Sequence, residues 1–218
     1  MQMLENAPKA VGHFSIQMLN KSGEVIDSYE DNNLVVNDAR GSMSALLSGK
    51  KGSVGINTLV LGTRGHDEVG NNILIPKPVG QYGYDENRTQ LFSEEQVTPF
   101  YYTIKWDAND LKDAGESPVE FTNNEVEFVA KGQRKKDNGS ELNAENGKIP
   151  VKITLQGNSV QYEFTIPEQY ANGADGASVV AYTEAGLKCG EKLFSIKCFS
   201  AKIKETSVSI RIIWKIVF

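Results

Sequence analysis

Apolar and polar positions alternate most regularly in the last residues of the chain, TSVSIRIIWKIVF (206–218). Every second position is a large apolar residue: Val208, Ile210, Ile212, Trp214, Ile216 and Phe218. This period of two is that of a β-strand with one buried face, so the run predicts a core strand near the centre of a sheet. The opposite face mixes Ile213 and Val217 with charged residues. We expect that face to be partly covered, by a helix or by another copy of the chain.

Two further stretches predict β-hairpins. In GHFSIQMLNKSGEVIDSYE (12–30), two alternating runs flank a turn at Gly23, where glycine can adopt a positive φ. In VKITLQGNSVQYEFTIP (151–167), the turn falls at Gly157.

Two single strands are also predicted. INTLVLGT (56–63) is almost continuously apolar and predicts a strand covered on both faces. PFYYTIKWD (99–107) predicts a strand that buries Phe100, Tyr102, Ile104 and Trp106 on one face.

Helical spacing is convincing only in residues 37–48, NDARGSMSALLS. We predict a short helix there, capped by Asn37 or Asp38, with one apolar side formed by Ala39, Met43, Leu46 and Leu47. No period is sustained from 64 to 98, so we expect a long loop excursion with a function or a partner of its own.

Many strands separated by Gly-rich turns predict an all-β fold, an antiparallel β-sandwich of jelly-roll type with one helix. We divide the chain into an N-terminal arm, 1–10, and a single domain, 11–218, into which the excursion at 64–98 is inserted. We expect the domain to fold without residues 66–96, and the excursion to contact other copies or other proteins.

Composition is that of a globular chain and argues against some partners. Of the 218 residues, 39% are apolar and 23% are charged, and the formal net charge is −5. A global basic field is absent, so we expect no nucleic-acid partner. No run approaches the roughly 20 apolar residues of a membrane span, and we expect no membrane partner. Cys189 and Cys198 are interpreted as reduced thiols rather than a disulfide.

Residues with catalytic or metal-binding chemistry are few. The chain has two histidines, and only His66 stands beside carboxylates, Asp67 and Glu68. ANGADGA (171–177) holds Asn172 and Asp175 but lacks the EF-hand ligand pattern. SGKKGS (48–53) lacks the P-loop spacing, and no nucleophile elbow occurs. We therefore predict a protein that is not an enzyme and binds no cofactor or metal, although a two-carboxylate glycosidase site built from scattered Asp and Glu stays open.

Two groups of residues are candidates for surface contacts. Exposed aromatic side chains can stack on sugar rings, which makes Tyr82, Tyr84 and Tyr101 possible glycan or partner contacts, together with Trp106. The basic residues Arg134, Lys135 and Lys136 follow Lys131 and form a possible basic patch for phosphate or an acidic partner. A solvated hairpin tip explains the basic residues equally well.

Three segments resemble tailed-bacteriophage virion proteins when taken in order. NNLVVNDARGSMSALLSG (32–49) is similar to an N-hydrophobic-V strand end that leads into a short helix. INTLVLGT (56–63) resembles the Gly-terminated strand that follows. The last segment, 182–218, resembles the closing pattern of such proteins: an E-A-G-L turn, an LF…F strand, a connector and a W-x-I-x-F end. The resemblance does not extend to the segment between 64 and 178.

This resemblance implies a non-enzymatic virion structural component of the tail, collar, baseplate or head surface. It implies assembly in the host cytoplasm, contacts with other virion proteins, and a homo-oligomeric state. A carbohydrate-binding β-sandwich module for host-surface attachment is the alternative.

Overall fold

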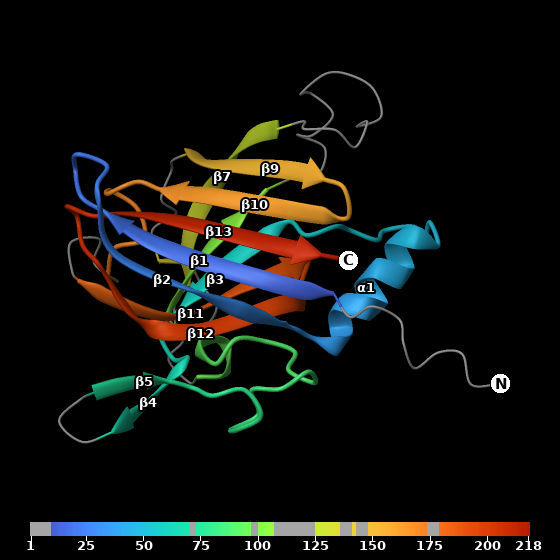
Figure 1. Cartoon of the computed structure of the whole chain (residues 1–218), viewed down its shortest axis with the longest axis horizontal. Helices are drawn as coiled ribbons and strands as arrows, with labels where there is room; N and C mark the ends of the chain where they lie inside the picture. Colours follow the sequence, from blue (N-terminus) through green and yellow to red (C-terminus); the bar gives the residue numbers. More distant parts are fainter. Residues whose placement is uncertain are drawn as a thin grey trace.

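The computed structural model describes residues 10–69, 73–96, 100–106, 125–135, 141–142, 148–173 and 179–218. In these residues the chain is an all-β protein with one α-helix (Figure 1). In chain order the elements are β1 (Val11–Leu19), β2 (Val25–Val35), α1 (Asn37–Leu47), β3 (Thr58–Gly62), β4 (His66–Val69), β5 (Ile73–Pro76), the 3-10 helix η1 (Ser93–Glu95), β6 (Tyr101–Lys105), β7 (Glu125–Lys135), β8 (Glu141–Leu142), β9 (Lys148–Gln156), β10 (Ser159–Ile166), β11 (Val180–Cys189), β12 (Lys192–Lys204) and β13 (Ser209–Val217).

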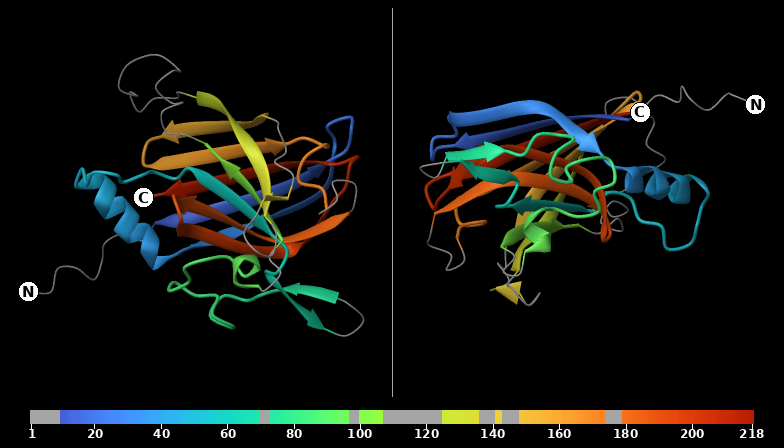
Figure 2. Two further views of the ribbon diagram at one scale, coloured as in Figure 1. Left: turned by 180° about the vertical axis from the view of Figure 1, so that it is seen from behind. Right: turned by 90° about the horizontal axis from the view of Figure 1, so that it is seen from below.

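One large antiparallel sheet forms the body. Its strand order is β6-β3-β11-β12-β2-β1-β13-β10-β9-β7-β8, and β6 also pairs with β7. That additional pairing brings the sheet back on itself, so it forms the two facing layers of a sandwich-like body (Figures 1 and 2). The joint between β12 and β2 is narrow, because only Ser195 and Ile196 pair with Val35 and Leu34 there. The predicted all-β antiparallel fold is confirmed.

The C-terminal strand lies at the centre of one layer. β13 pairs with β1 on one side and with β10 on the other (Figure 1). Ile210, Ile212, Trp214 and Ile216 are completely buried, as the alternation predicts. Phe218 differs, because it follows the last strand residue and is 46% exposed.

Both predicted hairpins are present. β1 and β2 are joined by a turn in which Gly23 has φ +80°, and β9 and β10 by a turn in which Gly157 has φ +56°. β3 is buried along its whole length, as its apolar sequence predicts. The E-A-G-L segment is a correction: it is not a turn but the buried middle of β11.

Helix α1 matches the predicted position, but its cap and its buried face differ from expectation. Val36 is the N-cap residue and no side chain caps the helix. Ala39 and Ser42 are buried, whereas Leu46 is exposed and Leu47 is 90% exposed. Figure 1 shows α1 at one end of the body, where only its first turns have strands beside them. Among the described residues, the side chains of Leu46 and Leu47 in the last turn are therefore left largely uncovered.

The excursion is more ordered than its sequence suggests. It contains the β4–β5 hairpin and η1, and it lies on the outer side of β11 and β12 (Figures 1 and 2). Its buried side chains pack with residues of β3, of β12 and of the β2–α1 junction in a second apolar cluster outside the main core. The members of this cluster are Val36, Val60, Tyr84, Leu91, Phe92, Leu193, Ile196 and Cys198. Removing 66–96 would expose this cluster, so the expectation that the domain folds without these residues is not supported.

Candidate functional site

Three neighbouring strands present a register of polar residues on the outer face of the sheet. In one row Thr58 of β3 pairs with Lys105 of β6 and with Lys188 of β11. In the next row Val60 pairs with Thr103 and Gly186. Paired residues of adjacent strands lie on the same face, so two lysines stand on either side of one threonine.

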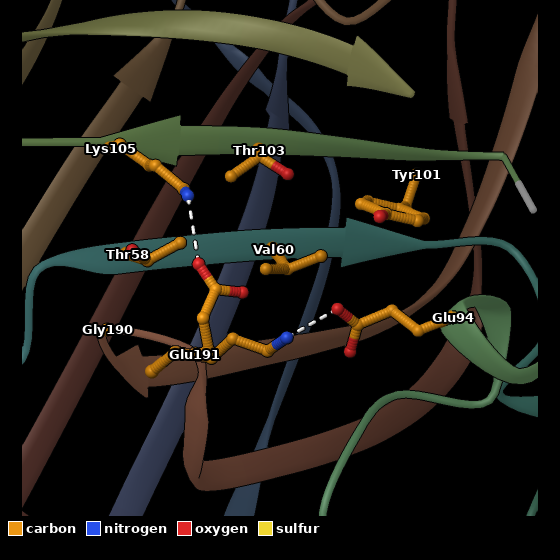
Figure 3. Close-up of a pocket in the computed structure, with 9 residues that line it drawn as sticks. Thr58, Val60, Glu94, Tyr101, Thr103, Lys105, Gly190 and Glu191 are labelled. Carbon is orange, nitrogen blue, oxygen red and sulfur yellow. Dashed lines mark hydrogen bonds and ion pairs between the residues drawn. The ribbon is translucent and has the colours of Figure 1, made fainter. Parts of the chain in front are cut away.

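This register forms the floor of a pocket of about 170 Å3 (Figure 3). Its lining residues are Thr58, Val60, Glu94, Tyr101, Thr103, Lys105, Lys188, Gly190 and Glu191. Figure 3 shows Tyr101 and Glu94 at one end and Lys105 with Glu191 toward the other. The residues come from β3, β6, β11, η1 and the β11–β12 turn, so the tertiary fold assembles them.

Two ion pairs of different strength flank the pocket. Lys188 pairs with Glu94, and their side chains are only 7% and 13% exposed. The other carboxylate oxygen of Glu94 accepts the backbone N–H of Leu91 at 2.8 Å, which fixes this pair. Lys105 and Glu191 are 3.4 Å apart, and their side chains are 51% and 88% exposed. Solvent screens this second pair, so it holds its partners only weakly.

The position of η1 depends on a buried carboxylate, Glu184. Its Oε2 accepts the N–H of Phe92 at 2.9 Å, and its Oε1 accepts the N–H and the hydroxyl of Ser93 at 2.7 and 2.5 Å. Complete burial raises the pKa of the Glu184 carboxyl above its ordinary value, although these hydrogen bonds oppose the shift. Glu184 thus anchors η1, and η1 carries Glu94 into the pocket.

The glycines of INTLVLGTRG and TEAGL make room for this anchor. A Cβ on Gly62 would stand 2.4 Å from the Glu184 carboxylate, and a Cβ on Gly65 2.6 Å from the carbonyl oxygen of Thr183. A Cβ on Gly186 would meet Leu91 of the excursion at 2.6 Å. These positions accept no larger residue without displacement of the segment that rests on them.

The three tyrosines proposed as glycan or partner contacts lie in different environments. Tyr82 is 67% exposed, and Tyr101 is half-buried at the pocket edge. Tyr84 is buried, and its hydroxyl donates to the carbonyl of Ile196 and accepts the N–H of Cys198. Tyr84 cannot contact a ligand at the surface, which corrects that prediction. Trp106 is likewise buried, with its ring against Tyr162 and Phe164.

The possible basic patch is described only in part. Arg134 and Lys135 lie in β7, where they pair in register with Tyr102 and Tyr101. Lys136 lies outside the described residues.

His66 and the ANGADGA loop have structural contacts. The Nδ1 of His66 lies 3.0 Å from the hydroxyl of Thr183. The side-chain oxygen of Asn172 accepts a hydrogen bond from the buried ammonium of Lys204, which also donates to the carbonyls of Glu168 and Glu205. The side-chain oxygen of Asn172 is therefore engaged by a protein cation, and Asp175 lies outside the described residues.

The described residues contain neither a cluster of metal ligands nor a membrane-spanning helix. In the part of the chain that the structure describes, no three His, Cys, Asp or Glu side chains group as metal ligands. None of the described helices has the length and apolar character needed to span a membrane.

Both cysteines are buried and free, as the sequence analysis predicts. In the β11–β12 ladder Cys189 pairs with Lys192 and Cys198 with Glu184, so the ladder does not place the thiols opposite each other. Burial raises the pKa of Cys189 to about 11 and that of Cys198 still further.

A second hollow, of about 360 Å3, lies between α1 and the β11–β12 turn. It brings Lys50, Lys51 and Ser53 of the SGKKGS segment next to Lys192. Gly190 and Glu191 line both hollows, so the β11–β12 turn separates them.

Sequence reasoning missed most of the pocket. Of its lining residues only Tyr101 was proposed as a contact, because Glu94, Lys105, Lys188 and Glu191 come from separate segments with no motif. A usable signal was the alternation in YYTIK, which sets Tyr101, Thr103 and Lys105 on one face.

No protein-family model, no curated protein and no solved structure matches this chain.

Proposed function

We propose that this chain is a non-enzymatic structural component of a tailed-bacteriophage virion that acts through contacts with other copies of itself and with other virion proteins. One observation carries the proposal: the three segments that resemble virion proteins are neighbours in the fold. β3 pairs with β11, β11 with β12, and β12 with β2, and α1 packs on β12. The resemblance therefore concerns one continuous structural unit.

Exposed apolar side chains support a role in contacts. Leu46 and Leu47 at the end of α1, and Val54 in the loop that follows, are exposed. Leu47 in particular gains nothing from this position in a monomer, because almost its whole side chain faces water. We place a contact between copies at this end of the body.

The mass of the purified chain tests the contact between copies. Light scattering over a range of concentrations should give a multiple of the 24.0 kDa chain mass. Leu47→Asp should shift the mass toward the monomer, whereas Val79→Asp, at an exposed site in the excursion, should not. A monomer at all concentrations would contradict the homo-oligomeric part of the proposal.

Incorporation into particles tests the virion role. Particles purified from cells that carry the tagged chain should contain it in stoichiometric amounts. If particles form and infect normally without the chain, the virion role is wrong.

A saccharide-binding role is the second candidate, and the pocket favours it. The pocket combines the ring of Tyr101 with the hydroxyl groups of Thr58 and Thr103, next to charged groups at both ends. Binding sites for small polar ligands combine apolar surface with a few convergent polar groups in this way. A polysaccharide pull-down with Tyr101→Ala, and with Val79→Ala at an exposed site outside the pocket as the control, tests this role. Equal retention of both variants would contradict it.

A further inference from the structure

We propose that the pocket binds a single acidic sugar residue, whose carboxylate takes the place of Glu191 beside Lys105. This inference rests on the saccharide-binding role and adds the class of sugar. It depends on the unequal ion pairs at the two ends of the pocket.

The two lysines differ in how firmly their charge is neutralised. The ammonium of Lys188 is buried with Glu94, and Glu94 is held in turn by the N–H of Leu91. Breaking this pair would leave a buried charge without a partner, so a ligand cannot displace Glu94 at low cost. The Lys105–Glu191 pair has neither burial nor a short contact. An incoming carboxylate can therefore replace Glu191 at Lys105 with little loss.

The β11–β12 turn gives Glu191 an alternative position. Glu191 follows Gly190, which has φ +61°, and is a lining residue of both the pocket and the second hollow. Lys50, Lys51 and Lys192 line that second hollow. Once displaced from Lys105, the Glu191 carboxylate still has lysines nearby, so the exchange does not leave it isolated.

The remaining groups fit a sugar ring better than a simple anion. The hydroxyl of Thr103 can donate and accept hydrogen bonds, and Thr103 lines the pocket together with the ring of Tyr101 and the apolar surface of Val60. Tyrosine combines an apolar ring face with a polar tip, which suits the apolar and hydroxylated sides of a sugar. The volume, about 170 Å3, is below the roughly 300 Å3 at which pockets for drug-sized ligands begin. One ring, rather than a long stretch of polymer, therefore fits.

An NMR titration with four probes tests the inference: methyl glucuronide, methyl galacturonide, methyl glucoside and acetate. The uronides should bind more tightly than the glucoside and acetate, with shifts at the amides of Thr103 and Gly190. Glu191→Gln removes the competing carboxylate and should tighten uronide binding about two- to five-fold. Lys105→Gln should weaken it by a similar factor. Lys21→Gln, in the distant β1–β2 turn, is the matched control and should change nothing.

Opposite effects of the two pocket variants are the decisive result, because general damage to the fold would weaken binding in both. Equal binding of glucoside and uronide, with no effect of Lys105→Gln, would overturn the acidic-sugar inference and leave the saccharide-binding role intact. Acetate binding as tight as uronide binding would show that charge alone is recognised, which also overturns it. If no sugar shifts any pocket amide, the saccharide-binding role itself fails.

Discussion

At the scale of single residues, the most consequential group is a carboxylate that the sequence does not mark. Glu184 stands in YTEAGL, where its neighbours predict only a strand or a turn. In the structure it is completely buried and accepts three hydrogen bonds from Phe92 and Ser93. Buried carboxylates are rare unless their lone pairs are satisfied, and here the excursion satisfies them.

Glu184→Gln should lower the free energy of unfolding by about 1–3 kcal/mol, because the amide nitrogen cannot accept a hydrogen bond that the carboxylate accepts. It should also change the pH dependence. Burial raises the pKa of Glu184 in the folded state, so the folded protein binds the proton more tightly than the unfolded chain. The contribution of this group to stability is therefore greatest below its unfolded pKa, about 4.3, and declines as the pH rises toward the folded pKa.

Urea unfolding at several pH values above about 4 measures both effects. The profile of Glu184→Gln should lack the decline that the wild-type protein shows, and Glu30→Gln, at an exposed site on β2, should leave it unchanged. Identical profiles for wild type and Glu184→Gln would show that Glu184 keeps an ordinary pKa.

Residue-level burial was only partly predictable from the sequence. Alternation assigned Ile212 and Trp214 to the core, because period two is a local property of a strand. Tyr82 and Tyr84 are two positions apart in a segment with no period, and one is exposed while the other is buried. Tertiary packing of the excursion determines which of the two tyrosines is buried, and the local sequence carries no signal of that packing.

At the scale of elements, the excursion is the part that the sequence described least well. Its sequence predicts a loop, because Gly, Pro and Asn interrupt any helical or strand-like alternation of apolar residues. In the structure its buried side chains cover the outer face of β3, β11 and β12. The strands, the hairpins and α1 were predictable because each has its own period or turn signal. The excursion has no period of its own, because it is ordered by contacts with a surface formed by distant strands.

The hydroxyl of Tyr84 joins the excursion to β12, which gives a test at this scale. Tyr84→Phe should lower the free energy of unfolding by about 1–2 kcal/mol, because the buried N–H of Cys198 and carbonyl of Ile196 lose that partner. Tyr82→Phe makes the same chemical change at an exposed site and should have no measurable effect. Thermal or urea unfolding checks both, and equal stability of the two variants would contradict the assigned contact.

At the scale of the whole molecule, the joint between β2 and β12 is a narrow part of the sheet, because only two residues of each strand pair there. Beyond its two paired positions, side chains cross between the strands. Lys197 donates to Asp31 at 2.7 Å, and Lys202 donates to Asp27 at 2.8 Å. Both lysine side chains are buried, whereas both aspartate side chains are half-exposed. The carboxylates of these two ion pairs therefore remain in contact with solvent.

Acid should weaken this joint. The hydrogen bond from Lys197 holds the pKa of the Asp31 carboxyl below its usual value, so its contribution to stability is present above about pH 4 and is lost as the pH falls through the folded pKa. Asp31→Asn should reduce stability at neutral pH by at most about 1 kcal/mol, because Asp31 is exposed, and should lose less stability in acid than the wild-type protein. Urea unfolding between pH 3 and 7 checks this, with Glu30→Gln as control; a parallel acid loss in Asp31→Asn would contradict it.

The buried thiols allow local opening of β11 and β12 to be measured by chemical modification. A thiol-selective reagent reacts with the thiolate, and burial keeps Cys189 and Cys198 both protonated and inaccessible. Modification at neutral pH must then wait for β11 and β12 to separate from their neighbours. The modification rate of each cysteine, compared with that of a short cysteine peptide, reports how often each part of these strands is released, without any label being introduced.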